Sequence, residues 1–126
     1  MTEVFDELFI EKEELNETFL KDMLSGRIRM TSDGEVIFSK DFDPKVKILL
    51  FLLSNKVFVI KKIKADESES SKNIELKTGM PGGTVRRTLR ELRKVSLLMQ
   101  KGKNYYVPNH SLIKIKNMVE TNDKRN

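Results

Sequence analysis

GMPGGTVRRTLRELRK, residues 79–94, joins a turn rich in glycine and proline to a segment with four arginines and one lysine in its last nine positions. A helix rotates by about 100° per residue, so Val85, Leu89 and Leu92 fall on one narrow stripe of a helix over residues 84–95. The cations fall beside or opposite that stripe. Like charges one turn apart repel each other, which indicates a face for phosphates and base edges rather than a face selected for stability. The five cations are Arg86, Arg87, Arg90, Arg93 and Lys94.

The charges of the chain divide into two parts. Residues 1–43 hold 12 acids and 5 bases, a balance of −7, whereas residues 44–126 hold 7 acids and 19 bases, a balance of +12. This division favours an acidic element over residues 1–43, for dimerisation or docking, and a basic domain over residues 44–121 that binds a polyanion. A solvated charged surface is the alternative reading. Residues 122–126 are expected to form a disordered tail.

Composition argues against several classes of protein. The chain of 126 residues has no cysteine and one histidine, His110, so thiol chemistry and histidine clusters for metals are excluded. We therefore expect no enzyme activity, no cofactor and no metal site. No apolar run approaches the ~20 residues of a membrane span, and the amino-terminal sequence is acidic where a secretory signal is basic. We expect a cytoplasmic protein that is associated with DNA.

The amino-terminal third predicts a helix followed by a hairpin. Residues 2–25 have a helical apolar stripe, and Ser25-Gly26 is typical of a helix end. Residues 27–31 and 35–38 alternate polar and apolar side chains around Asp33-Gly34, a dipeptide that favours a tight turn.

The middle of the chain begins with a buried helix. Asp43 and Pro44 are suited to its cap and first position, and Ser54-Asn55 is expected to break it. Residues 57–63 are ambiguous between a strand and a second short helix, of which we favour the helix. The polar segment over residues 64–72 is expected to be a loop.

The carboxy-terminal half predicts further short elements. A helix capped by Ser70 or Ser71 ends at Thr78, and Gly79 closes it. The helix over residues 84–95 follows, and residues 97–107 form two strands joined at Lys101-Gly102-Lys103. A last helix is expected over residues 110–121.

The segment SKNIELKTGMPGGTVRRTLRELRKVSLLMQKGKNYYVP, residues 71–108, resembles the winged helix-turn-helix family of DNA-binding proteins. Ile74 and Thr78-Gly79 are similar to the second helix and turn of that family, and Leu89 and Leu92 to core positions of its recognition helix. Glu75 differs, because the family usually carries a small residue there. The resemblance covers about residues 44–119 and is strongest to archaeal winged-helix transcription regulators. It implies a mainly α fold with small β structure, namely a winged helix-turn-helix preceded by a helix and a hairpin.

The resemblance also implies a function. The recognition helix over residues 84–95 would enter the major groove of double-stranded DNA, and the wing over residues 97–107 would contact the adjacent backbone or minor groove. A sequence-specific transcriptional regulator is thus expected. The alternative is a winged-helix module for protein interaction in a replication, transcription or partition assembly. The expected DNA-binding residues are Thr84, Arg86, Arg87, Arg90, Arg93, Lys94, Lys101, Lys103 and Tyr105.

A homodimer is expected as well, since one recognition helix covers little DNA and two half-sites raise specific affinity. The dimer would be held by the amino-terminal helix, the last helix or both. The acidic region over residues 1–43 is the candidate surface for another protein partner.

Overall fold

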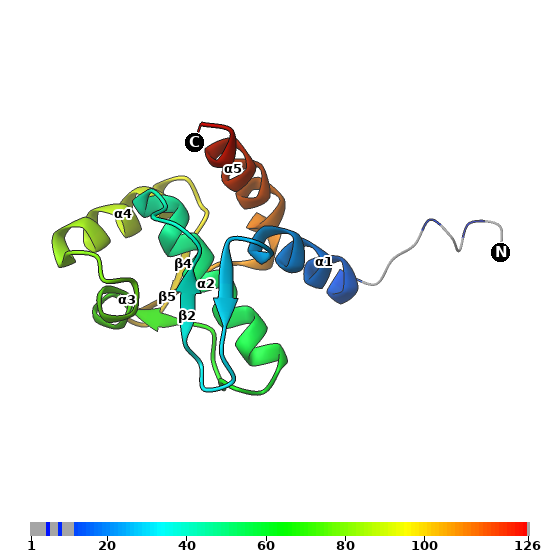
Figure 1. Ribbon diagram of the computed structural model, residues 1–126, viewed down its shortest axis with the longest axis horizontal. Coiled ribbons are helices and arrows are strands. Elements are labelled where there is room, and N and C mark those ends of the chain that lie inside the picture. The colour runs from blue at the N-terminus through cyan, green and yellow to red at the C-terminus, as the bar shows by residue number, and fades with distance from the viewer. Residues whose placement is uncertain (1–4, 6–7, 9–11, 126) are drawn as a thin grey trace.

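The computed structural model describes Phe5, Leu8 and residues 12–125. This part of the chain is mainly helical, with two small antiparallel sheets (Figure 1). In chain order the elements are α1 (Lys12–Leu24), β1 (Ile28–Met30), β2 (Val36–Phe38), α2 (Pro44–Ile60), β3 (Glu69–Ser70), α3 (Ser71–Thr78), α4 (Gly82–Lys94), β4 (Met99–Lys101), β5 (Asn104–Tyr106), the 3₁₀ turn η2 (Asn109–Ser111) and α5 (Leu112–Arg125).

Helix α2 forms the centre of the core. It contacts α1, α3, α4 and α5, so residues 48–55 along its middle are all buried. Pro44 occupies the first position of the helix, where its missing N–H costs nothing, and Asp43 stands at the cap position as expected. Asp43 makes no side-chain cap hydrogen bond.

The expected break of this helix at Ser54-Asn55 is wrong. The Ser54 hydroxyl donates to the carbonyl of Phe51 at 2.5 Å, and the Asn55 amide donates to the carbonyl of Glu67 at 3.0 Å. Because both buried polar side chains have partners, the helix continues through them. Residues 57–60 are therefore its last turn and not a second helix, and Lys62, with a φ of 61°, lies just beyond the end.

The helix and hairpin expected in the amino-terminal third are present. Helix α1 ends at Leu24, and before Lys12 only Phe5 and Leu8 of the expected helix are among the described residues. Strands β1 and β2 pair with Arg29 opposite Ile37, and Gly34 has a φ of 92° in the turn between them. Met30, Val36 and Phe38 pack against the core from this hairpin.

The acidic and basic parts of the chain share one hydrophobic core. From the acidic part, the buried core residues are Leu20, Met23, Leu24, Ile28 and Phe42. They belong to the same cluster as the buried residues of α2 to α5. From the sequence, the apolar stripe of the amino-terminal helix is expected to contribute to a dimer. Most of that stripe on α1 is instead buried inside the same chain.

The helices α3 and α4 are joined by three residues, Gly79 to Pro81. Ser70 caps α3 by accepting a hydrogen bond from the Asn73 backbone at 3.1 Å, as expected of Ser70 or Ser71. Gly79 adopts a left-handed φ of 73°, which glycine reaches without strain. Helix α4 begins at Gly82, two residues before the expected start at Thr84, because the glycine pair expected in the turn forms its first turn instead.

The ribbon after α4 is part of a three-stranded sheet with the order β3-β5-β4. The expected pair of strands is confirmed, with Gln100 opposite Tyr105. The loop expected over residues 64–72 is wrong at its end, since Glu69 pairs with Tyr105 in the sheet. Strand β3 has only two residues, too few to show an alternating pattern, so it is recognised only by its pairing with β5.

Helix α5 closes the core through Leu112, Ile115 and Val119. It extends to Arg125, so residues 122–125, expected to be a disordered tail, are helical, and residue 126 lies outside the described residues. Within the described ranges, none of the helices has the length and apolar character needed to cross a membrane.

Candidate nucleic-acid interface

The amphipathic pattern predicted for α4 is confirmed by burial. Val85, Thr88, Leu89 and Leu92 face the core with at most 2% of their surface exposed. The side chains on the other side of the helix are exposed, and they are Arg86, Arg87, Arg90, Glu91, Arg93 and Lys94. The helical register derived from the sequence is therefore the register of the structure.

Among the described residues, the cations on this face form no ion pair within 4.0 Å, although the Glu75 carboxylate lies near the Arg86 guanidinium. The ion pairs found there, all with N–O distances of 4.0 Å or less, involve other side chains. Helix α4 carries five bases and one acid, a balance of +4. Because these guanidinium and ammonium groups are exposed and unpaired, they are available to an anionic ligand. We call the five cations of α4 the cationic face.

The cationic face is separated from the acidic amino-terminal helix. Helix α4 packs on α2 and α3 and lies at the end of the molecule opposite α1 (Figure 1). Helix α1 carries four acids and two bases, a balance of −2. A polyanion on α4 would therefore not meet the charge of α1 directly.

The turn between α3 and α4 brings Glu75 close to the start of α4. A Cβ atom on Gly82 would lie 2.8 Å from the Glu75 Oε1 atom and 3.0 Å from the Arg86 Nη1 atom. Glycine at position 82 thus leaves room for the larger side chain at position 75. Thr84, in this first turn, is half-buried, so it is less accessible than the arginines that follow it.

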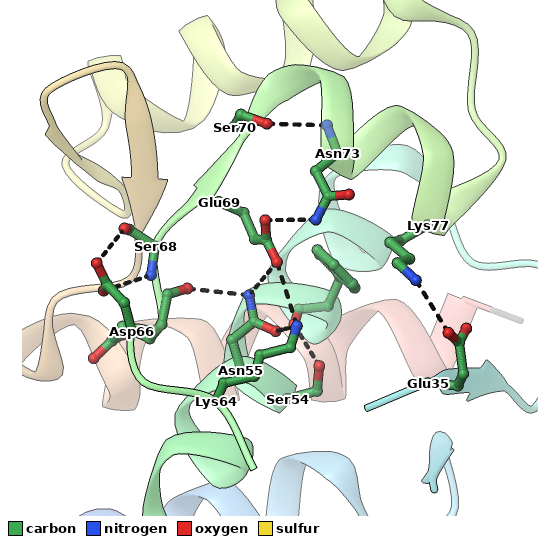
Figure 2. A network of polar contacts seen from close by, with 12 residues as sticks. Glu35, Ser54, Asn55, Lys64, Asp66, Ser68, Glu69, Ser70, Asn73 and Lys77 are labelled. Atoms are coloured by element: carbon green, nitrogen blue, oxygen red, sulfur yellow. Dashed lines mark hydrogen bonds and ion pairs between the residues drawn. The ribbon is translucent and has the colours of Figure 1, made fainter. Parts of the chain in front are cut away.

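A polar network fixes α3 relative to α2 (Figure 2). Glu69 Oε1 accepts hydrogen bonds from Lys64 at 3.3 Å and from Asn55 at 3.4 Å, and Glu69 Oε2 accepts one from Asn73 at 2.6 Å. Lys64 also donates to Asn55 at 2.8 Å and lies 5.1 Å from the ring centroid of Phe58. Sequence reasoning missed this network, because its members come from α2, the following linker, β3 and α3.

Two of the expected DNA-binding residues on the ribbon of β4 and β5, Lys101 and Tyr105, make contacts within the chain. Lys101 forms a solvent-exposed ion pair with Asp66, with an N–O distance of 3.1 Å. The pKa of Asp66 is lowered, chiefly because the Ser68 backbone N–H donates to the carboxylate, and further because Lys101 donates to it. Tyr105 is half-buried and packs against the core, so it is the inward tyrosine of the strand, while the Tyr106 hydroxyl contacts the Met99 sulfur at 3.9 Å.

The expected site residues thus fall into two groups. The cationic face and Lys103 are exposed, and in the described part of the chain they have no ion-pair partner. Thr84, Lys101 and Tyr105 are half-buried or engaged in other contacts. Compared with known proteins, the chain matches no family model, no curated protein and no solved structure.

Proposed function

We propose that this protein is a winged helix-turn-helix protein that binds double-stranded DNA in a sequence-specific manner and acts as a transcriptional regulator. The cationic face carries the proposal, because five exposed cations that form no ion pair among the described residues stand opposite a buried apolar stripe on one helix. The repulsion among like charges destabilises such a helix until an anion neutralises it. A DNA backbone supplies that anion.

The arrangement of elements supports this proposal. Two helices joined by three residues, with a left-handed glycine in the turn, are typical of a helix-turn-helix. Helix α4 is the second helix of this pair, and its outer face is cationic. The major groove of B-DNA, about 12 Å wide, admits one α-helix. The ribbon of β4 and β5 follows α4 and would contact the adjacent backbone or minor groove.

The residues of the cationic face have different roles in this proposal. Arg86, Arg87 and Arg90 lie in the first two-thirds of α4, which would point toward base edges, and arginine pairs bidentately with guanine O6 and N7. Arg93 and Lys94 lie at its end and would bind phosphates. Lys103, exposed in the turn between β4 and β5, would reach the neighbouring backbone.

A salt titration of binding tests the proposal. Binding of the full-length protein to genomic fragments and to a random-sequence duplex would be followed by fluorescence anisotropy. The double variant Arg87→Ala, Arg90→Ala is expected to bind at least about tenfold more weakly, and its salt slope should fall by about two. Both side chains are exposed, so the melting temperature should not fall.

A charge-matched control separates the site from general electrostatics. The variant Lys12→Ala, Arg29→Ala also removes two exposed cations, but from α1 and β1. It should bind DNA nearly as well as the wild type. An equal loss in both double variants, or no loss in either, would refute the cationic face as the binding site. In that case a role in protein interaction would be the better account of the fold.

A further inference from the structure

An apolar groove of about 500 Å³ lies on the side of the molecule formed by α1, β1 and the end of α2. Its apolar lining consists of Leu20, Leu24, Ile28, Met30, Val57 and Ile60. Ile60 is 48% exposed there. The volume lies within the range of sites that hold a ligand or a few large side chains.

Two described residues near the amino-terminal end of the chain, Phe5 and Leu8, are exposed apolar side chains. Their exposed fractions are 56% and 77%. The sequence VFDELF, residues 4–9, spaces its apolar residues four apart, from Val4 to Leu8 and from Phe5 to Phe9. Residues at this spacing share one face of a helix, so the segment can present a continuous apolar surface.

We propose that the segment over residues 4–9 of one copy of this chain binds in the groove of a second copy, and that the second copy does the same in return. Within a single chain, Phe5 and Leu8 remain exposed while the groove remains open. A reciprocal exchange buries the apolar side chains of each segment in the groove of the other copy, and it gives a closed, two-fold symmetric dimer. This dimer is independent of the proposed DNA binding.

The charges along the groove are compatible with this occupant. Lys21 and Lys61 line the groove and can attract Asp6 and Glu7, the acids within the inserted segment. Two acids also line the groove, so its charged side chains are balanced and the apolar contacts provide the main attraction. The groove includes Leu20 and Leu24 from the apolar stripe of α1, so this interface still involves the amino-terminal helix, as expected of a dimer from the sequence.

Sedimentation equilibrium on the full-length protein tests the proposal. The wild type is expected to be dimeric at tens of micromolar. The variant Phe5→Asp, Leu8→Asp and the groove variant Ile60→Asp should each raise the dimer dissociation constant by about tenfold or more, because buried apolar contacts are lost. The matched control is Ile113→Asp, an exposed isoleucine of α5 outside the groove, which should leave the dimer intact.

Mixing the two variants distinguishes exchange between copies from insertion within one copy. The Ile60→Asp protein retains an intact segment, and the Phe5→Asp, Leu8→Asp protein retains an intact groove. A mixture should therefore form heterodimers through one of the two contacts, with an affinity between those of the wild type and the single variants. A monomeric wild type, an unaffected variant dimer, or a mixture that does not associate would each overturn the proposal.

Discussion

Arg27 and Asp123, which are 96 residues apart in the chain, form an ion pair that joins the residues after α1 to the last turns of α5. The same guanidinium donates to the carbonyls of Asp22 and Met23 at 3.2 and 2.9 Å, so it also satisfies the end of α1. Unpaired carbonyls at a helix end need such donors. This side chain therefore adds a polar link between the end of α1 and α5, beside the hydrophobic core that both helices share.

We predict that Arg27→Ala lowers the free energy of unfolding by about 1–3 kcal/mol, because charged hydrogen bonds to two carbonyls and a carboxylate are lost together. Asp123→Asn should cost less than about 1 kcal/mol, because the Asp123 side chain is 37% exposed and solvent screens the pair. Urea denaturation measures both values. Arg29→Ala, an exposed arginine of β1, serves as the control and should change stability by no more than about 0.5 kcal/mol.

Leu89→Ala is expected to destabilise the protein by about 2–5 kcal/mol. Leu89 is 1% exposed at the centre of the buried face of α4, so its truncation leaves a cavity against α2 and α3. Chemical denaturation checks the value. A loss as small as that of a surface substitution would contradict the packing of α4 described above.

Asp66→Asn should increase the affinity for duplex DNA by about two- to fivefold and steepen the salt slope by about one, if the cationic face binds DNA as proposed. The substitution removes the carboxylate that pairs with Lys101 at 3.1 Å, so the lysine becomes available to phosphate. Glu13→Gln, which changes the net charge equally on α1, is the control and should have little effect.

The pH dependence of that pair follows from the lowered pKa of Asp66. A carboxyl group with a lowered pKa in the folded state contributes stability above its unfolded pKa, and this contribution is lost as the pH falls through the folded value. The Asp66–Lys101 pair should thus be intact at neutral pH. An NMR titration of the Asp66 carboxyl carbon should give a midpoint below that of an unstructured aspartate, and a midpoint above it would contradict the hydrogen bonds from Ser68 and Lys101.

Glu69→Ala, in β3, is predicted to lower the free energy of unfolding by about 1–3 kcal/mol, because it removes the shared acceptor of Lys64, Asn55 and Asn73. Hydrogen exchange should report faster opening of α3 than of α5 in this variant. Glu67→Ala would be a less suitable control, since Glu67 pairs with the buried Lys56 at 2.7 Å. Ser68→Ala, in the linker before β3, leaves the Glu69 network intact and should affect α3 little.

Local patterns were sufficient to predict the parts of the fold and the site that depend on neighbouring residues. The buried and exposed sides of α4 follow from residues three and four apart, and Gly79 and Gly34 mark turns through their own backbone freedom. The cap at Ser70 is also a local interaction. In each of these elements, the residues that interact lie close together in the sequence, so a local pattern is enough to predict them.

Tertiary structure alone decided the features whose partners lie far away in the sequence. Asn55 remains within α2 because the carbonyl of Glu67 accepts its hydrogen bond, and β3 exists because β5 pairs with it. Lys101 pairs with Asp66, 35 residues earlier. A polar side chain takes its role from whichever partner folding brings within hydrogen-bond distance, and no local pattern specifies that partner.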